Sequence, residues 1–183
     1  GRELAYTETF DFLFTLATGD EVEYIGESSG ELIEAKPLDR AATTAEIKGE
    51  LERQKVEGAS VRSDDLGVTI TLENVNFQAN SDALLPTEQE KLRRIASILG
   101  NYPDRDILIT GHTARVPGYT EADHQSLSEA RAAAVADYLL RIGAVREIQT
   151  ATRGRGYREP VADNATEAGR RLNRRVEITI LEN

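Results

Sequence analysis

The residues of this sequence that are best placed to bind a charged ligand are the five from Gly111 to Arg115, which read Gly-His-Thr-Ala-Arg. They directly follow a short apolar run, Ile107-Leu108-Ile109, which is typical of a strand covered on both faces. A loop that leaves such a strand presents its residues to solvent, and loops held by a rigid scaffold often carry function. The plainer interpretation is a strand end in which Gly111 supplies backbone freedom.

Arg131 is a second candidate, inside a predicted helix that Ser126 and Glu129 would begin as a capping box. A cation near the N-terminal end of a helix opposes the helix dipole, which favours anions there. With the free backbone N–H groups of that end, the guanidinium would make a receptor for a carboxylate. The ordinary alternative is a solvated side chain.

The C-terminal part of the chain is rich in arginine, although the protein carries a net charge of −10. The arginines concerned are Arg153, Arg155, Arg158, Arg170, Arg171, Arg174 and Arg175. Acidic residues such as Asp163 and Glu167 lie among them, which indicates ion pairs and anion contacts. The acidic net charge and the lack of interleaved aromatic residues both argue against a nucleic-acid partner.

Two histidines, His112 and His124, lie near Glu121 and Asp123. They lack the close i, i+4 spacing of helical metal sites, so we expect structural or hydrogen-bonding roles and no metal. The chain has no cysteine, no Gly-x-Ser-x-Gly elbow and no Walker loop. Residues 154–159 match only the first half of a dinucleotide fingerprint, so neither a cofactor nor catalysis is expected.

The chain has two regions that differ in charge composition. Residues 1–65 contain 16 acids and 7 bases, whereas the rest of the chain is nearly balanced. Residues 1–40 predict a short β meander, which is either part of an upstream domain or a small sheet that packs against the rest of the chain. Alternating Phe10, Phe12 and Phe14 form its first strand, the Gly26–Gly30 loop follows the second, and Leu32 lies in the third. Residues 41–60 predict a connecting helix, since Thr43 with Glu46 fits a capping box.

Residues 61–183 predict an α+β domain with a mixed sheet in two layers and its helices on one face. The expected order is strand, helix, strand, helix, strand, short helix, strand. Its strands are centred on 68–77, 107–109, 148–152 and 176–180, and its helices begin at Pro86, Ser126 and about Thr166.

From about Leu66 to Leu181 the sequence resembles the C-terminal peptidoglycan-binding domain of the OmpA family. The resemblance rests on a set of short motifs in the family's order. These are Val75-Asn76-Phe77 with Asn80, Gly111-His112-Thr113, the run from Leu127 to Ala132 with Val135 and Tyr138-Leu139, Gly154 with Gly156, Pro160 and Asn164, and Gly169-Arg170 leading to the run from Asn173 to Ile178.

The resemblance implies a non-catalytic module outside the cytoplasmic membrane that grips the stem peptide of peptidoglycan. In the family, an Asp after Gly-His-Thr accepts the ammonium of diaminopimelate, and the Arg of Leu-Ser-x-x-Arg-Ala clamps its carboxylate. Arg131 matches the clamp, but Ala114 stands where the Asp is expected, and His124 replaces a family Asn. A lost charge-assisted hydrogen bond corresponds to about ten- to hundredfold weaker binding.

The expected pocket therefore has Thr113, Ala114 and Arg131 as its floor, with His112, His124, Phe77 and Arg175 nearby. Three outcomes are open. Glu121 or Asp123 replaces the missing carboxylate; the pocket suits a wall with another diamino acid, such as ornithine; or the fold has lost wall binding and serves as a structural or protein-interaction module. The first two predict a protein that contacts peptidoglycan. The resemblance implies a periplasmic location, outer-membrane association through an upstream segment and envelope proteins as further partners.

Overall fold

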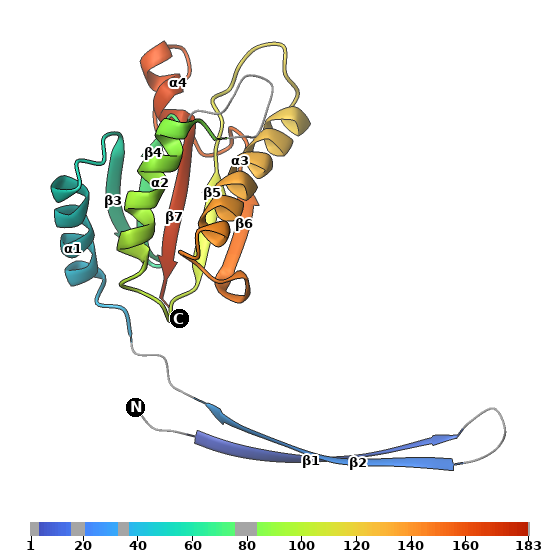
Figure 1. Ribbon diagram of the computed structural model, residues 1–183. Coiled ribbons are helices and arrows are strands. Elements are labelled where there is room, and N and C mark those ends of the chain that lie inside the picture. The colour runs from blue at the N-terminus through green and yellow to red at the C-terminus, as the bar shows by residue number, and fades with distance from the viewer. Residues whose placement is uncertain (1–3, 16–20, 33–36, 76–83, 183) are drawn as a thin grey trace. The chain divides into compact units, whose positions relative to one another are not determined.

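The computed structural model describes residues 4–15, 21–32, 37–75 and 84–182 (Figure 1). The chain divides into two compact units, Gly1–Pro37 and Leu38–Asn183. The boundary thus precedes the helix that the sequence suggests as a connector, and this helix belongs to the larger unit.

The smaller unit is an antiparallel hairpin of two long strands, β1 (Leu4–Thr15) and β2 (Glu21–Leu32). The expected loop at Gly26–Gly30 is wrong, because these residues pair with β1, with Gly26 opposite Phe10 and Gly30 opposite Tyr6. Backbone pairing does not require apolar side chains, so the Gly- and Ser-rich stretch continues the strand. The third predicted strand has no counterpart in the described part of this unit.

Helix α1 (Arg40–Arg53) begins at Asp39, whose carboxylate accepts a hydrogen bond from the backbone of Ala42. The N-cap is therefore Asp39 and not Thr43, which lies inside the helix. Ile47 and Leu51 are buried in the same hydrophobic core as the sheet residues described below. The helix therefore packs as part of the larger unit.

The larger unit is built on a five-stranded sheet. Its strands are β3 (Ala59–Asp64), β4 (Gly67–Glu73), β5 (Ile107–Gly111), β6 (Thr150–Gly154) and β7 (Arg175–Leu181), in the spatial order β3-β4-β7-β5-β6. β5 and β6 are parallel, and every other neighbouring pair is antiparallel. The C-terminal strand β7 is thus central, between two segments that are far from it in sequence.

Three further helices complete this unit: α2 (Pro86–Leu99), α3 (Glu121–Arg141) and the short α4 (Glu167–Asn173). Helices α1, α2 and α3 lie on one face of the sheet (Figure 1). The predicted α+β class, the mixed sheet and the helices on one face are confirmed. No helix in the described ranges has the length and apolar character that crossing a membrane requires.

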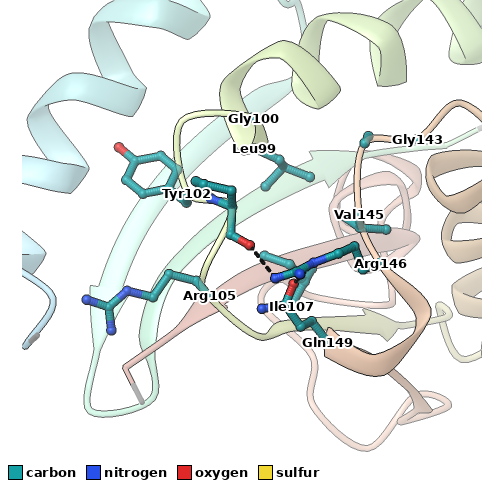
Figure 2. Close-up of a pocket in the computed structure, with 11 residues that line it drawn as sticks. Leu99, Gly100, Tyr102, Arg105, Ile107, Gly143, Val145, Arg146 and Gln149 are labelled. Atoms are coloured by element: carbon teal, nitrogen blue, oxygen red, sulfur yellow. Dashed lines mark hydrogen bonds between the residues drawn. The ribbon is translucent and has the colours of Figure 1, made fainter. Parts of the chain in front are cut away.

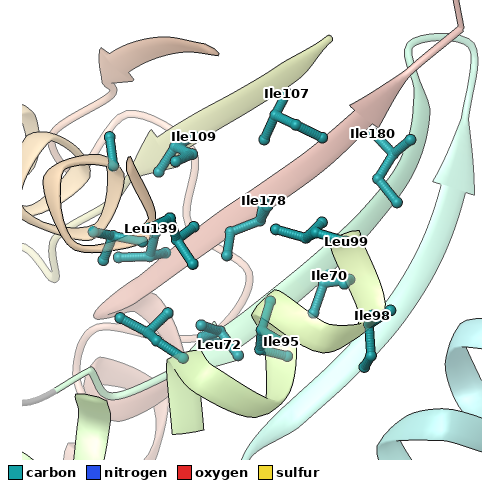
Figure 3. Close-up of a cluster of buried hydrophobic side chains, with 14 of the residues drawn as sticks. Ile70, Leu72, Ile95, Ile98, Leu99, Ile107, Ile109, Leu139, Ile178 and Ile180 are labelled. Carbon is teal, nitrogen blue, oxygen red and sulfur yellow. The ribbon is translucent and has the colours of Figure 1, made fainter. Parts of the chain in front are cut away.

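The face of the sheet beneath the helices is apolar. Every second residue of the central strands points into it, as in Ile70 opposite Ile178 and Ile109 opposite Ile178. Ile95 of α2 and Leu139 of α3 pack against them, and all these side chains are 0% exposed (Figure 3). The core thus joins the sheet to α2 and α3.

Two strands differ from expectation. β3 was not foreseen, because its sequence Ala-Ser-Val-Arg-Ser-Asp carries a single large apolar residue, as an edge strand tolerates. β6 starts at Thr150, two residues later than predicted. Ile148 lies in the preceding 3₁₀ turn (Glu147–Gln149) and is 91% exposed, so its apolar character did not mark a buried strand.

Candidate functional site

The end of β5 is pressed closely against helix α3. A Cβ added to Gly111 would lie 2.0 Å from the backbone oxygen of Ser128, so only glycine allows this approach. The hydroxyl of Ser128 accepts a hydrogen bond from the backbone of Gly156, which ties the loop after β6 to the same place. Gly111, Ser128 and Gly156 thus bring together three of the motifs on which the family resemblance rests.

Thr113 connects the strand end to α3. Its backbone N–H donates to the oxygen of Gly156 at 2.8 Å, and its hydroxyl hydrogen-bonds Nδ1 of His124 at 3.1 Å. The His124 ring is buried and contacts two tyrosine rings, Tyr157 at 5.0 Å and Tyr119 at 6.0 Å between centroids. The structure therefore brings together two of the predicted site residues, Thr113 and His124.

Ala114, which replaces the family's acidic residue, is 2% exposed. The next residue, Arg115, is exposed, and its backbone N–H donates to Oδ1 of Asn164. Asn164 is in turn held by the amide of the fully buried Asn173. The loop after β5 is thereby fastened to the loop that precedes α4.

The two acidic residues that could have replaced the missing carboxylate are engaged elsewhere. Glu121 forms an ion pair with Arg158 at 2.7 Å. Asp123 accepts hydrogen bonds from the backbone and the hydroxyl of Thr120, both at 2.7 Å, which lower the pKa of its carboxyl. Both carboxylates therefore have partners of their own at the start of α3.

Helix α3 begins at Glu121, with Thr120 and Asp123 as its capping box, and the predicted start at Ser126 is wrong. Arg131 is therefore ten residues, or about three turns, into the helix, where the N-terminal dipole and free N–H groups no longer act. Its guanidinium is partly buried. Burial and the nearby positive charge of Arg174 lower the pKa of Arg131 below its ordinary value.

His112 and Arg175 lie in a second cluster, whose centre is Glu177. The backbone of His112 donates to the oxygen of Arg175, and Arg175 Nε donates to Glu177 at 2.8 Å. Arg62 of the edge strand β3 also donates a hydrogen bond to Glu177, at 3.0 Å. Burial opposes ionisation of Glu177, but hydrogen bonds from His112 and Arg175 outweigh it and lower its pKa to about 2. The charge of Arg175 is thus balanced internally.

Phe77, the remaining predicted site residue, lies outside the described residues. Among the described residues, no group of three His, Asp or Glu side chains is arranged to hold a metal ion. The two histidines have different partners, Thr113 for His124 and the Arg175–Glu177 pair for His112.

A cavity of about 810 Å³ opens beside the loop after β5. Its lining comprises Arg115, Val116, Pro117, Gly118, Tyr119, Tyr157, Asn164, Ala165 and Arg170. The guanidinium carbon of Arg115 lies 5.5 Å from the centre of the Tyr157 ring, a cation–π contact. Sequence reasoning missed the two tyrosines; their position in Gly- and Pro-rich loops, where aromatic residues have no core role, could have marked them.

A second cavity, of about 310 Å³, lies near the start of β5 and so at the other end of that strand (Figure 2). Leu99, Ile107 and Val145 give it apolar walls. Arg146 donates to the backbone oxygen of Pro103 across it and to the side chain of Gln149. The side chains of Arg146 and Gln149 are thus engaged in hydrogen bonds within the fold.

The five-stranded mixed sheet with helices on one face, the glycine-dependent contact of β5 with α3 and the motif residues gathered there define an OmpA-like domain. Residues 76–174 match the model of the OmpA family, and the chain belongs to that family.

Two named proteins illustrate the similarity of this chain to its relatives. It is 34% identical over 131 residues to the probable lipoprotein YiaD of Escherichia coli, covering 70% of this chain and 58% of that protein. It is 39% identical over 106 residues to the peptidoglycan-binding protein ArfA of Mycobacterium tuberculosis, covering 58% of this chain and 32% of that protein. The chain therefore spans less than two thirds of either relative.

Among solved structures, the chain is similar to the cell wall anchor of the T6SS from Pseudomonas aeruginosa, with a TM-score of 0.63 and 30% sequence identity. That similarity covers 81% of this chain and 100% of the other.

Proposed function

We propose that this protein is a non-catalytic module of the bacterial cell envelope that contacts the stem peptide of peptidoglycan in the periplasm, with altered or weakened recognition of diaminopimelate. Membership of the OmpA family supports the module, and the names of a relative and of a solved neighbour, a peptidoglycan-binding protein and a cell wall anchor, support the partner. The residue expected to hold a carboxylate of the stem peptide is Arg131.

The observation that carries the proposal is the position of Arg131, which matches the family's clamp residue. It lies in α3 one residue before Ala132, whose backbone approaches Gly111, so it belongs to the end of the sheet that carries Thr113. A guanidinium can bind a carboxylate through two parallel hydrogen bonds, so an arginine at this position suits a carboxylate of the stem peptide.

The alternative is an OmpA-like fold that has lost wall binding and serves as a structural or protein-interaction module. The burial of Thr113 and Ala114, 4% and 2% exposed, favours this alternative, because neither side chain offers a ligand much surface. The two functions make different predictions, because only wall binding makes sedimentation with peptidoglycan depend on Arg131.

Co-sedimentation with purified peptidoglycan sacculi tests the proposal. Wild type is expected to sediment with the sacculi, Arg131→Ala to remain largely in solution and Arg131→Lys to show intermediate binding, because Lys keeps the charge but not the bidentate geometry. Arg141→Ala is the matched control, since Arg141 is an exposed arginine at the other end of α3. Thermal melts of each variant separate loss of binding from loss of folding.

Equal and poor sedimentation of wild type and Arg131→Ala would show that wall binding is wrong and would favour the interaction module. Catalysis is tested in the same samples. A binding module releases no soluble fragments from the sacculi, so release of muropeptides that depends on this protein would overturn the non-catalytic part of the proposal.

A further inference from the structure

Strand β6 is one edge of the five-stranded sheet, and in the described part of the chain it pairs with β5 alone (Figure 1). The backbone N–H of Arg155, the residue after the strand, donates to the oxygen of Gly111 at the end of β5. Because successive residues of a strand direct their backbone groups to opposite sides, those of Arg153 also face β5 and those of Thr152 face away from it. Thr152 is exposed, so its N–H and C=O are open to a further strand.

A side chain already pairs with this edge in the way that a strand would. The amide nitrogen of Gln125, in α3, donates to the backbone oxygen of Gly154 at 3.0 Å. Gly154 is two residues after Thr152, so the backbone groups of both residues face the same way. The contact shows that a hydrogen-bond donor can reach the outer side of β6.

A groove of about 680 Å³ lies between β6 and α3. Three of the helix residues that line it are small, namely Ser126, Ala130 and Ala133. Thr152 also lines the groove and is paired in register with the buried Ile109, so it lies on the face of the sheet that the helices cover. A strand added to β6 would place every second side chain in this groove, where small residues fit.

Arg153 gives the edge a positive charge on the other face of the sheet. Its Nε donates to the hydroxyl of Thr110 at 3.0 Å, and among the described residues no carboxylate forms an ion pair with it. The acidic residue in the same row of the sheet, Glu177, lies beyond β5 and accepts hydrogen bonds from two other arginines. Glu129 is acidic but lies on the α3 side, since it lines the groove. An acidic side chain thus suits the Arg153 side of an added strand, and small neutral ones suit the α3 side.

We propose that the β6 edge binds an extended segment of a partner protein, which pairs with the backbone of Thr152, presents small side chains to the groove and presents an acidic side chain to Arg153. An extended chain matches these features, because a strand offers backbone donors and acceptors at the spacing of an edge and side chains that alternate between two faces. The inference is independent of wall binding and adds a protein partner to the proposed module.

NMR titration of the ¹⁵N-labelled chain with two end-blocked heptapeptides tests the inference. One is Thr-Glu-Thr-Glu-Thr-Glu-Thr, and the other has lysine in place of each glutamate. At about 0.15 M salt, which screens long-range charge, the glutamate peptide is expected to shift the β6 amide signals and to bind about tenfold more tightly. Arg153→Glu should reverse this preference. Arg141→Glu, the same change at an exposed arginine at the end of α3, is the matched control and should keep it.

A second pair of variants tests the backbone pairing. Thr152→Pro removes the outward N–H, and proline is tolerated on an edge strand where the N–H faces solvent, so the pairing of β6 with β5 is kept. Thr152→Val retains the N–H and is the matched control. We expect Thr152→Pro to weaken binding of the glutamate peptide by about five- to tenfold, the effect of one lost hydrogen bond, and Thr152→Val to bind like wild type. Thermal melts verify that both variants fold.

Three results would each overturn the inference: no shift of the β6 signals at millimolar peptide, equal binding of the two peptides, or a Thr152→Pro variant that binds as well as Thr152→Val. Self-association of the wild-type chain in sedimentation velocity that Thr152→Pro abolishes would also overturn it and would assign the edge to a second copy of the chain. None of these results depends on Arg131, so the proposed function is decided by its own experiment.

Discussion

The hydroxyl of Thr113 and the ring nitrogen Nδ1 of His124 lie 3.1 Å apart. This buried hydrogen bond joins the loop after β5 to the first turn of α3. Both side chains are about 4% exposed. The pair therefore sets the position of the loop that carries Ala114 and Arg115 relative to the helix that carries Arg131.

A double-mutant cycle should detect this coupling. Thr113→Val is expected to lower the free energy of unfolding by about 1 kcal/mol, the net value of one hydrogen bond. His124→Ala should lower it by about 2 kcal/mol, because it also removes the contacts with Tyr119 and Tyr157. In the double variant the losses should fall short of their sum by about 1 kcal/mol in urea titrations. Simple additivity would show that the hydrogen bond contributes nothing.

Ala114→Asp tests the meaning of the missing acidic residue. A carboxylate at this position should raise the affinity for a muropeptide with a free amine by about tenfold or more, because it supplies the ammonium with a counter-charge. It should also lower the free energy of unfolding by about 1–3 kcal/mol, since the position is 2% exposed. Calorimetric titration and thermal melts measure the two effects.

Ala114→Asn is the matched control for this variant, because it has nearly the same size without the charge. It should share the loss of stability and gain no affinity. Equal affinities of the two variants would show that the divergence of the site is not confined to position 114.

The ion-paired Glu177 predicts a dependence of stability on pH. Its pKa is about 2 in the folded protein against an ordinary value of 4.5, so the ionised form stabilises the fold above pH 4.5, and this contribution is lost as the pH falls toward 2. Glu177→Gln leaves the buried Arg175 without its counter-charge and should cost about 3 kcal/mol at pH 7. The difference between the variant and wild type should shrink steadily between pH 4.5 and pH 2 in urea titrations.

Glu167→Gln serves as the comparison for Glu177, because Glu167 also pairs with arginine but is exposed. Solvent screens such a pair, so its removal should cost much less. A difference between wild type and Glu177→Gln that stays constant down to pH 2 would contradict the role assigned to the cluster of Glu177, Arg175 and His112.

Two glycine substitutions should have opposite effects. Gly111→Ala places a methyl group 2.0 Å from the backbone oxygen of Ser128, so α3 must move, and we expect a loss of about 3 kcal/mol or more. Gly49→Ala lies inside α1 with no atom within 4 Å of the added carbon and should gain about 0.5–1 kcal/mol. Chemical denaturation measures both; a tolerated Gly111→Ala would contradict the close contact of β5 with α3.

Much of the fold could be predicted from local patterns. The alternating Val176, Ile178 and Ile180 predict β7, and Pro86 with Gly100 brackets α2 as observed. These patterns report directly which side chains repeat on a buried face. The edge strand β3 could not be predicted in this way, because an edge strand has few apolar residues. Its pairing with β4 depends on backbone groups that every sequence supplies.

For the site, the sequence by itself determined the family, the retained Arg131 and the replacement of an acidic residue by Ala114, because these are matters of residue identity and order. Only the tertiary structure decided that the capping box of α3 is Thr120 with Asp123 and not Ser126 with Glu129. Both pairs satisfy the local capping pattern, and the path of the loop selects between them. The tertiary structure also decided that Glu121 and Asp123 are engaged elsewhere and that Tyr119, Tyr157 and Arg115 meet around one cavity. Charge balance and burial depend on neighbours that are distant in sequence, and local residue patterns carry no record of those neighbours.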